Sequence, residues 1–275
     1  MPLKDNFKIA ICQLKVSDDK LDNLSRAAKF IKKAYNEYSP DIIILPEMFN
    51  CPYSYDYFQR FAESFPGEST RLLSGLAKEF ETYIIGGSIP EVDRKKIYNT
   101  SYVFDRKGDL LAKHRKIHLF DIDISDGISF QESKHISPGK DTTVFDTDLC
   151  RTGVAICYDI RFPELIRKMV LRGALLVIAP AAFSMTTGPS HWHITARTRA
   201  LDNQIYFVGA STARDPSSVY AAYGHSLIAD PWGNIISEAS SSQEIICGTI
   251  NLDELKRIRR EFPLLKHKRF ELYRY

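Results

Sequence analysis

Several motifs that define common classes of protein are missing from this sequence. There is no CxxC pair, no HExxH segment and no Cys/His spacing of the kind that binds zinc. The five cysteines are Cys12, Cys51, Cys150, Cys157 and Cys247. Their odd number and irregular spacing argue against a disulfide framework and favour a reducing compartment. No uncharged apolar run approaches the ~20 residues that a membrane-spanning helix needs, so we expect no membrane partner.

Signals for nucleotide binding, nucleic-acid binding and secretion are lacking as well. No GxxxxGK[ST] loop occurs, and the segment after the first apolar strand reads KVSDDKLDN rather than a GxGxxG turn. The 37 basic and 34 acidic residues nearly balance, and the densest basic stretch, 256–269, is typical of a solvated C-terminal helix. The N-terminal sequence has no apolar segment of the signal-peptide kind. We therefore expect a cytoplasmic protein that binds no nucleic acid.

The pattern of apolar residues alternates between strand and helix. Segment 7–14 alternates apolar and polar residues, as a half-buried strand does, and 21–38 repeats apolar residues at helical spacing. Further strands are predicted at 41–45, 83–88, 97–104, 110–117, 151–156, 175–179, 206–210, 226–230, 235–239 and 244–250, with helices at 72–80, 162–172, 192–203 and 252–261. No low-complexity linker divides the chain. The pattern predicts an α/β fold with mixed sheets covered by helices, in a single domain over residues 1–275.

Three reactive side chains directly follow predicted strands, where ligands bind in open α/β sheets. The first is Glu47, in the segment IIILPEMF, where Pro46 constrains the exit of the chain from the strand. Partial burial would raise the pKa of this carboxylate toward a value that suits a general base. Strand ends are commonly polar, so a solvent-facing loop glutamate remains the alternative.

Lys116 is the second residue, at the end of a predicted hairpin strand in the segment KHRKIHLFD. A lysine held in a dry pocket can stabilise negative charge that develops during a reaction. The neighbouring cations leave open the alternative of a surface basic cluster.

Cys157 is the third residue, between a strand and the start of a helix in the segment RTGVAICYDIRFPE. A helix start or a nearby cation would lower the pKa of its thiol and favour the nucleophilic thiolate, and both conditions are plausible here. The alternative is a buried, inert cysteine, which suits Cys12, Cys150 and Cys247 better. Together, a thiol, a carboxylate and an ammonium group are what amide hydrolysis through a thioester needs.

These motifs, together and in this order, resemble the nitrilase superfamily of Glu-Lys-Cys carbon–nitrogen hydrolases. The matching segments are LPEMFNCPYS, KHRKIHLFD and GVAICYDIRFPEL, and the likeness covers nearly the whole chain. The resemblance implies a four-layer αββα sandwich that commonly dimerises through helices beside the cysteine. It implies no cofactor and no metal. The C-terminal tail, about residues 252–275, could lie at the dimer interface.

Within the superfamily the sequence is most similar to the omega-amidases, on segments that include NCPYS, HLFDIDI, SFQES and AFSMTTGPSHWH. This likeness implies cleavage of the terminal amide of α-ketoglutaramate or α-ketosuccinamate. Ser184 and His193 depart from the closest relatives, where Asn and Glu are expected, and leave the pocket detail open. Other amidases with the same triad, such as a deaminated-glutathione amidase or an N-carbamoyl amidase, remain alternatives, as does a catalytically idle scaffold.

The resemblance also assigns supporting roles. Glu132 matches a glutamate that orients the lysine and the base, and the backbone N–H of Tyr158 would help to hold the oxyanion. Arg161 would bind the distal carboxylate of the substrate, because its planar guanidinium suits a carboxylate, although pairing with Glu164 is the alternative. Tyr53 and Phe183 would wall the pocket, and His191 and His193 would form a satisfied polar pair beside it.

Overall fold

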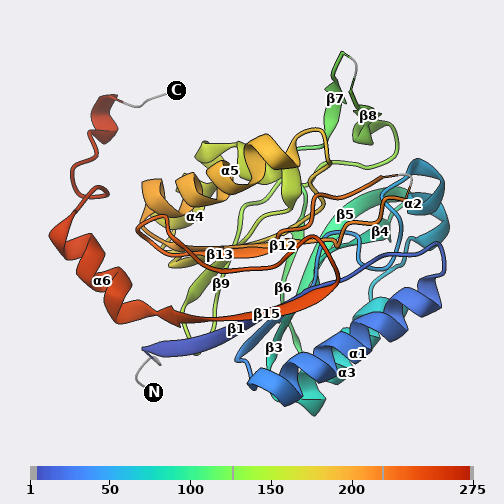
Figure 1. The fold of residues 1–275 in the computed structure, drawn as a ribbon, viewed down its shortest axis with the longest axis horizontal. Coiled ribbons are helices and arrows are strands. Elements are labelled where there is room, and N and C mark those ends of the chain that lie inside the picture. Colours follow the sequence, from blue (N-terminus) through green and yellow to red (C-terminus); the bar gives the residue numbers. More distant parts are fainter. Residues whose placement is uncertain (1–4, 126, 219, 273–275) are drawn as a thin grey trace.

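The computed structural model describes residues 5–125, 127–218 and 220–272, so both extreme ends of the predicted domain lie outside the described residues. Two β-sheets pack face to face, and helices cover the outer face of each (Figure 1). The molecule is therefore a four-layer αββα sandwich, as predicted.

The first sheet has seven strands among the described residues, in the order β15-β1-β2-β3-β5-β4, with β6 paired to β5. Parallel pairing joins β1, β2 and β3, whereas β15, β4, β5 and β6 pair antiparallel. The strands are β1 (Asn6–Gln13), β2 (Ile42–Ile44), β3 (Tyr83–Ile85), β4 (Ile89–Asp93), β5 (Lys96–Phe104), β6 (Leu110–Arg115) and β15 (Glu244–Asn251).

The second sheet has six strands among the described residues, in the order β14-β13-β12-β11-β10-β9. Its strands β10, β11 and β12 are parallel. The strands are β9 (Thr143–Asp146), β10 (Arg151–Val154), β11 (Leu176–Ala181), β12 (Tyr206–Ser211), β13 (Leu227–Ala229) and β14 (Ile235–Glu238). A short ribbon of β7 (Asp121–Asp123) and β8 (Ser129–Gln131) projects from the sandwich (Figure 1).

Three apolar layers hold the sandwich together. Ile9 and Ile44 of the first sheet meet Val154 and Ile178 of the second in a fully buried inter-sheet core. The apolar stripes of the helices form the two outer cores, as expected for amphipathic helices on a sheet. Helices α1 (Lys20–Tyr38) and α3 (Glu68–Glu79) cover the first sheet, and α4 (Pro163–Leu171) and α5 (Gly188–Asn203) cover the second.

Five further helical segments occur in the described part of the chain. They are α2 (Tyr55–Phe61), α6 (Leu252–Glu261), η1 (Glu132–Lys134), η2 (Cys157–Arg161) and η3 (Phe270–Leu272). The C-terminal stretch from α6 to η3 extends beyond the side of the sandwich (Figure 1). In the described part of the chain, no helix has the length and apolar character to cross a membrane.

Candidate active site

A buried ammonium group lies at the centre of the site. Lys116 directly follows β6, and its Nζ donates hydrogen bonds to Glu47 Oε1, Glu132 Oε2 and the Tyr53 hydroxyl, each at 2.9 Å. Burial would lower the pKa of this lysine, but the negative charges of Glu132 and Glu47 outweigh it and hold the pKa well above its usual value. Lys116 therefore remains a cation between two carboxylates, so the alternative of a surface basic cluster is wrong.

Glu47 is also buried, in the turn that follows β2, which excludes a solvent-facing loop glutamate. Burial raises the pKa of its carboxyl group, Lys116 opposes this, and Glu132 raises the pKa further, with a raised value as the net result. Its Oε1 accepts from Lys116 and from Asn99 Nδ2, the latter at 2.8 Å. Its Oε2 makes no hydrogen bond of standard geometry with any described residue. This oxygen is therefore available to accept a proton.

Cys157 comes from the other sheet, in the first position of η2 just beyond β10. Its thiol is near enough to Glu47 for each group to shift the pKa of the other. Burial and the charge of Glu47 raise the pKa of the thiol well above its usual value, and Lys116 only partly offsets them. The expected net lowering of the thiol pKa is therefore wrong, because burial and Glu47 outweigh the cation. The resting group is a neutral thiol beside a base.

The backbone of Cys157 adopts a left-handed conformation, with φ of +44°. Residues other than glycine rarely occupy this region, and such strain persists only where the surrounding structure enforces it. Asp159, two residues on, provides part of that enforcement. Its buried carboxylate accepts the backbone N–H of Ile156 at 3.1 Å. A hydrogen bond within the turn thus helps to fix the backbone that carries Cys157.

The same carboxylate also binds the segment around Lys116. Asp159 accepts from His114 Nε2 at 3.1 Å, from His118 Nδ1 at 2.8 Å and from the backbone N–H groups of Ile117 and His118 at 3.2 and 2.9 Å. Since a carboxylate only accepts, both ring nitrogens must carry the protons. These donors hold the pKa of Asp159 well below its usual value, although burial opposes them. Asp159 therefore connects the lysine segment with the cysteine turn.

Arg161, at the end of η2, makes no ion pair with a carboxylate in the described part of the chain. Its Nη1 lies 3.0 Å from His191 Nδ1, and its guanidinium carbon lies 4.7 Å from the centre of the Phe183 ring. Tyr158 is a second aromatic neighbour, at 5.8 Å. Pairing with Glu164 is therefore not observed, and the contacts of the Arg161 guanidinium with described residues are with aromatic rings and an imidazole.

A small hollow opens beside Glu47, which is one of its lining residues. Tyr53, Ala182 and Tyr220 also line it, and the rings of Tyr53 and Tyr220 lie 4.9 Å apart between centres. The Tyr220 hydroxyl donates to the Ala182 carbonyl at 2.7 Å. Tyr53 therefore does more than wall the hollow, because it also binds the lysine.

The structure brings Glu47, Lys116 and Glu132 into direct contact and sets Cys157 beside Glu47. Sequence reasoning missed Asn99, Asp159 and Tyr220 as site residues. Asn99 faces the site from a strand, and only Asp159 carried a signal, as an acidic residue two positions beyond the nucleophile. His191 and His193 are not a pair. His191 contacts Arg161, whereas His193 Nε2 contacts Glu238 at 2.9 Å.

The fold and this constellation match a known class. The chain belongs to the carbon–nitrogen hydrolase family, whose model matches residues 8–260. The protein is accordingly a hydrolase of carbon–nitrogen bonds with a nitrilase-type αββα fold, which confirms the predicted superfamily and enzyme class.

Individual relatives agree over nearly the full chain. The sequence is 50% identical to omega-amidase NIT2 of Mus musculus over 267 residues, which cover 97% of this chain and 96% of the relative. It is 51% identical to omega-amidase NIT2-A of Xenopus laevis with the same coverage. The structure is similar to that of Nit3 from Saccharomyces cerevisiae, described as a member of branch 10 of the nitrilase superfamily. That match has a TM-score of 0.90 and 44% identity and covers 98% of each chain.

Proposed function

We propose that this chain is an omega-amidase that hydrolyses the terminal amide of a short α-keto dicarboxylic monoamide, α-ketoglutaramate or α-ketosuccinamate. The observation that carries the proposal is the identity of about half of all residues with omega-amidases along nearly the whole chain. The cluster of Glu47, Lys116 and Glu132 beside a buried thiol supplies chemistry that suits this reaction.

Glu47 and Cys157 carry the first half of the reaction. Glu47 Oε2 accepts the proton of the Cys157 thiol while the sulfur attacks the amide carbonyl carbon. The raised pKa of Glu47 suits this transfer, because a stronger base takes a proton more readily from a neutral thiol. The tetrahedral intermediate then collapses, the carbon–nitrogen bond breaks, and Glu47 returns the proton to the leaving ammonia. A thioester remains on Cys157.

Lys116 and the backbone N–H of Tyr158 stabilise the negative charge that forms on the carbonyl oxygen. A permanently charged donor in a buried site is effective because the surrounding medium screens it weakly. In the second half, Glu47 deprotonates a water molecule that attacks the thioester carbon; the carbon–sulfur bond breaks, Glu47 returns the proton to the sulfur of Cys157, and the keto acid is released. Glu132 and Asn99 keep the lysine and the base in position during both halves.

Arg161 binds the distal carboxylate of the substrate. Its guanidinium is close to the catalytic turn and lacks an acidic partner among the described residues, so a substrate carboxylate would satisfy it. Phe183 and Tyr158 line the approach to it.

The test is ammonia release from a panel of α-ketoglutaramate, α-ketosuccinamate, free glutamine, deaminated glutathione, an N-carbamoyl amino acid and a simple nitrile. We expect the keto amides to give the highest kcat/KM. The Cys157→Ala variant should lose about 10⁴-fold or more of that activity. A preference for deaminated glutathione or an N-carbamoyl substrate would replace the proposal with one of those amidases. Substantial turnover by the variant would remove the cysteine from the mechanism.

We further propose a cytoplasmic homodimer, with a fraction of the protein in mitochondria and the chain acting as one domain over residues 1–275. Large apolar side chains on the outer helices support the dimer, since Ile194 and Leu201 of α5 and Leu171 of α4 are 64%, 40% and 55% exposed. The described part of the tail, residues 252–272, extends beyond the side of the sandwich (Figure 1), and we expect the tail over about 252–275 to contact the partner subunit.

A further inference from the structure

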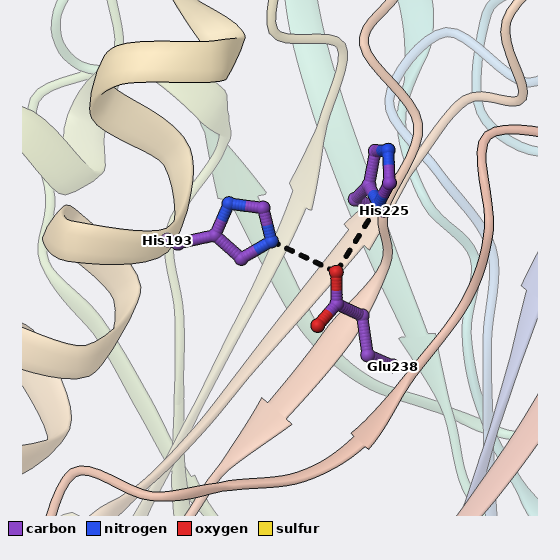
Figure 2. Close-up of side chains that lie close together, drawn as sticks. All are labelled: His193, His225 and Glu238. Atoms are coloured by element: carbon purple, nitrogen blue, oxygen red, sulfur yellow. Dashed lines mark hydrogen bonds and ion pairs between the residues drawn. The ribbon is translucent and has the colours of Figure 1, made fainter.

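Three side chains that can bind a metal ion meet on the surface of the second sheet, outside the catalytic cluster. His193 lies on α5, His225 lies in the turn before β13, and Glu238 is the last residue of β14 (Figure 2). Glu238 Oε1 accepts from His193 Nε2 at 2.9 Å and from His225 Nδ1 at 3.1 Å. The ligand atoms of the three residues all lie within 4.8 Å of one another. Both imidazoles therefore point at one carboxylate oxygen.

From this geometry we infer that His193, His225 and Glu238 bind one divalent transition-metal ion, with Zn²⁺ as the best match. Two imidazoles and a carboxylate are ligands that zinc accepts, with a water in the fourth position of a tetrahedron. Zinc–ligand distances of about 2.0–2.1 Å place neighbouring ligand atoms roughly 3.3 Å apart. The two observed contacts need to lengthen by a few tenths of an ångström, and the two ring nitrogens, which lie within 4.8 Å of each other, need to reach a similar separation.

Two of the three ligands are already held in place. The imidazole ring of His225 stacks on the ring of Tyr223, with 4.4 Å between their centres. The backbone carbonyl of His225 accepts a hydrogen bond from Nε1 of the buried Trp192 at 2.6 Å. His225 also has a φ of +58°, a conformation that costs free energy and points to a constraint on where its side chain lies. His193 directly follows Trp192 on α5, so the tryptophan links the helix that carries one histidine to the segment that carries the other.

The cluster is open enough for an ion to enter. The side chains of His193, His225 and Glu238 are 30%, 25% and 35% exposed, so each is fixed by neighbours yet reached by water. Within the described residues, this is the one group of three or more His, Cys, Asp or Glu side chains that lie close enough together to share a metal ion. The three residues come from a helix, the segment before a strand and the end of another strand, so their spacing in the sequence does not indicate a metal site.

A bound ion would connect α5 to the end of β14 independently of the catalytic chemistry. His191 lies two residues before His193 on the same helix and contacts Arg161. His191 and His193 therefore belong to different sites. The inference does not rest on the proposed amidase activity, and its failure would leave that proposal unaffected.

The direct test is calorimetric titration of Zn²⁺ into metal-free Cys157→Ser protein at about pH 8, where imidazole is unprotonated. The serine removes the catalytic thiol as a competing ligand. We expect one ion per chain. His193→Ala, His225→Ala and Glu238→Gln should each weaken binding on the order of 100-fold, because each removes one ligand of the ion. His267→Ala, which removes an exposed histidine outside the cluster, should bind as tightly as the parent.

A second measurement identifies the ligands. Co²⁺ in the same protein should give the visible spectrum of nitrogen and oxygen ligation without thiolate-to-cobalt charge-transfer bands, and the spectrum should vanish in His193→Ala. Circular dichroism in the absence of metal checks that each variant is folded. No binding at tens of micromolar Zn²⁺, unchanged binding in folded ligand variants, or a thiolate band would overturn the inference.

Discussion

Arg161 carries a positive charge that no carboxylate of the described chain neutralises. Its guanidinium contacts His191 and packs over the ring of Phe183. Arg161 is the last residue of η2, the short helix that begins at Cys157. Although Nη1 contacts His191, the guanidinium keeps further N–H groups for a bidentate contact with an incoming carboxylate. Arg161 is therefore the residue that would separate dicarboxylic substrates from neutral ones.

Replacing Arg161 by alanine should raise KM for α-ketoglutaramate by roughly 10–100-fold, which corresponds to loss of about 1.5–3 kcal/mol from a charged hydrogen bond. The KM for a neutral short amide should change little, because that substrate offers the guanidinium no anion. Steady-state kinetics with both substrates measures the difference, and His191→Ala serves as the control for loss of the neighbouring contact. An equal effect of Arg161→Ala on both substrates would exclude carboxylate recognition.

Individual site residues differed in how far the sequence revealed them. Glu47, Lys116 and Cys157 could be singled out because each follows a strand, and the family resemblance added Glu132. The direction of the thiol pKa could not be foreseen. Burial and the charge of Glu47 raise the pKa of the thiol, whereas Lys116 lowers it. The relative size of these effects depends on distances and burial in the folded chain, which the sequence does not show.

Between elements, the buried carboxylate of Asp159 joins the end of β6 to the turn after β10. It accepts donors from both segments, so it sets the position of the cysteine relative to the lysine. An amide at this position would turn one N–H group toward other N–H donors and would leave part of the set unpaired. Asp159 is a positioning residue rather than a catalytic one.

The Asp159→Asn variant should lose roughly 3 kcal/mol of stability at neutral pH, as expected when one partner of a buried charged network is removed. The pKa of Asp159 is lower in the folded protein than the unfolded value of about 3.9, so its stabilisation is complete above that value and is lost as the pH falls below it. The difference from wild type, measured by denaturant unfolding, should therefore shrink below about pH 4.

A matched control is Asp146→Asn, which removes a 69% exposed carboxylate paired with Arg151 on the neighbouring strands. It should cost less than about 1 kcal/mol. In the Asp159→Asn variant, kcat should also fall while KM changes little. A stability difference that persists unchanged to low pH would contradict the role assigned to the ionised carboxylate.

Most elements could be predicted from the sequence, including short strands with continuous apolar runs such as β2 and β3. The stripe of apolar residues over 21–38 predicted α1 within one residue at its start, and the hairpin at 226–239 is confirmed by the pairing of β13 with β14. The strands β4, β7, β8 and β9 and the helix α2 were missed. β4 contains Pro90, and β7 and β8 each have a single apolar residue between two polar ones, so no apolar run marks them as strands.

On the scale of the whole molecule, the exposed apolar side chains of α5 suggest where a second copy would pack. Ile194 and Leu201 are seven positions apart and so share one helical face, and both are exposed although they are large and apolar. The helix also carries His191 toward the catalytic side. A dimer formed on this face would place the two catalytic centres near the shared interface.

Replacing Ile194 by glutamate should convert the proposed dimer to a monomer, because the charge would have to be buried in an apolar interface. Sedimentation velocity should give wild-type protein near twice the chain mass of 31.4 kDa and the variant near that mass. Leu21→Glu, at an equally exposed leucine on α1 of the opposite layer, should remain dimeric. A wild-type protein that sediments as a monomer, or a dimeric Ile194→Glu variant, would contradict the proposal.

The proton acceptor and the ammonium group belong to one sheet, whereas the sulfur belongs to the other. The reacting atoms therefore meet only while the apolar inter-sheet core remains packed. A slight slip of one sheet across the other would part them before any helix or strand had melted. Catalytic turnover should therefore respond to a disturbance of the inter-sheet core sooner than any spectroscopic measure of secondary structure. Mutations deep in that core can abolish catalysis although they contact none of the reacting groups.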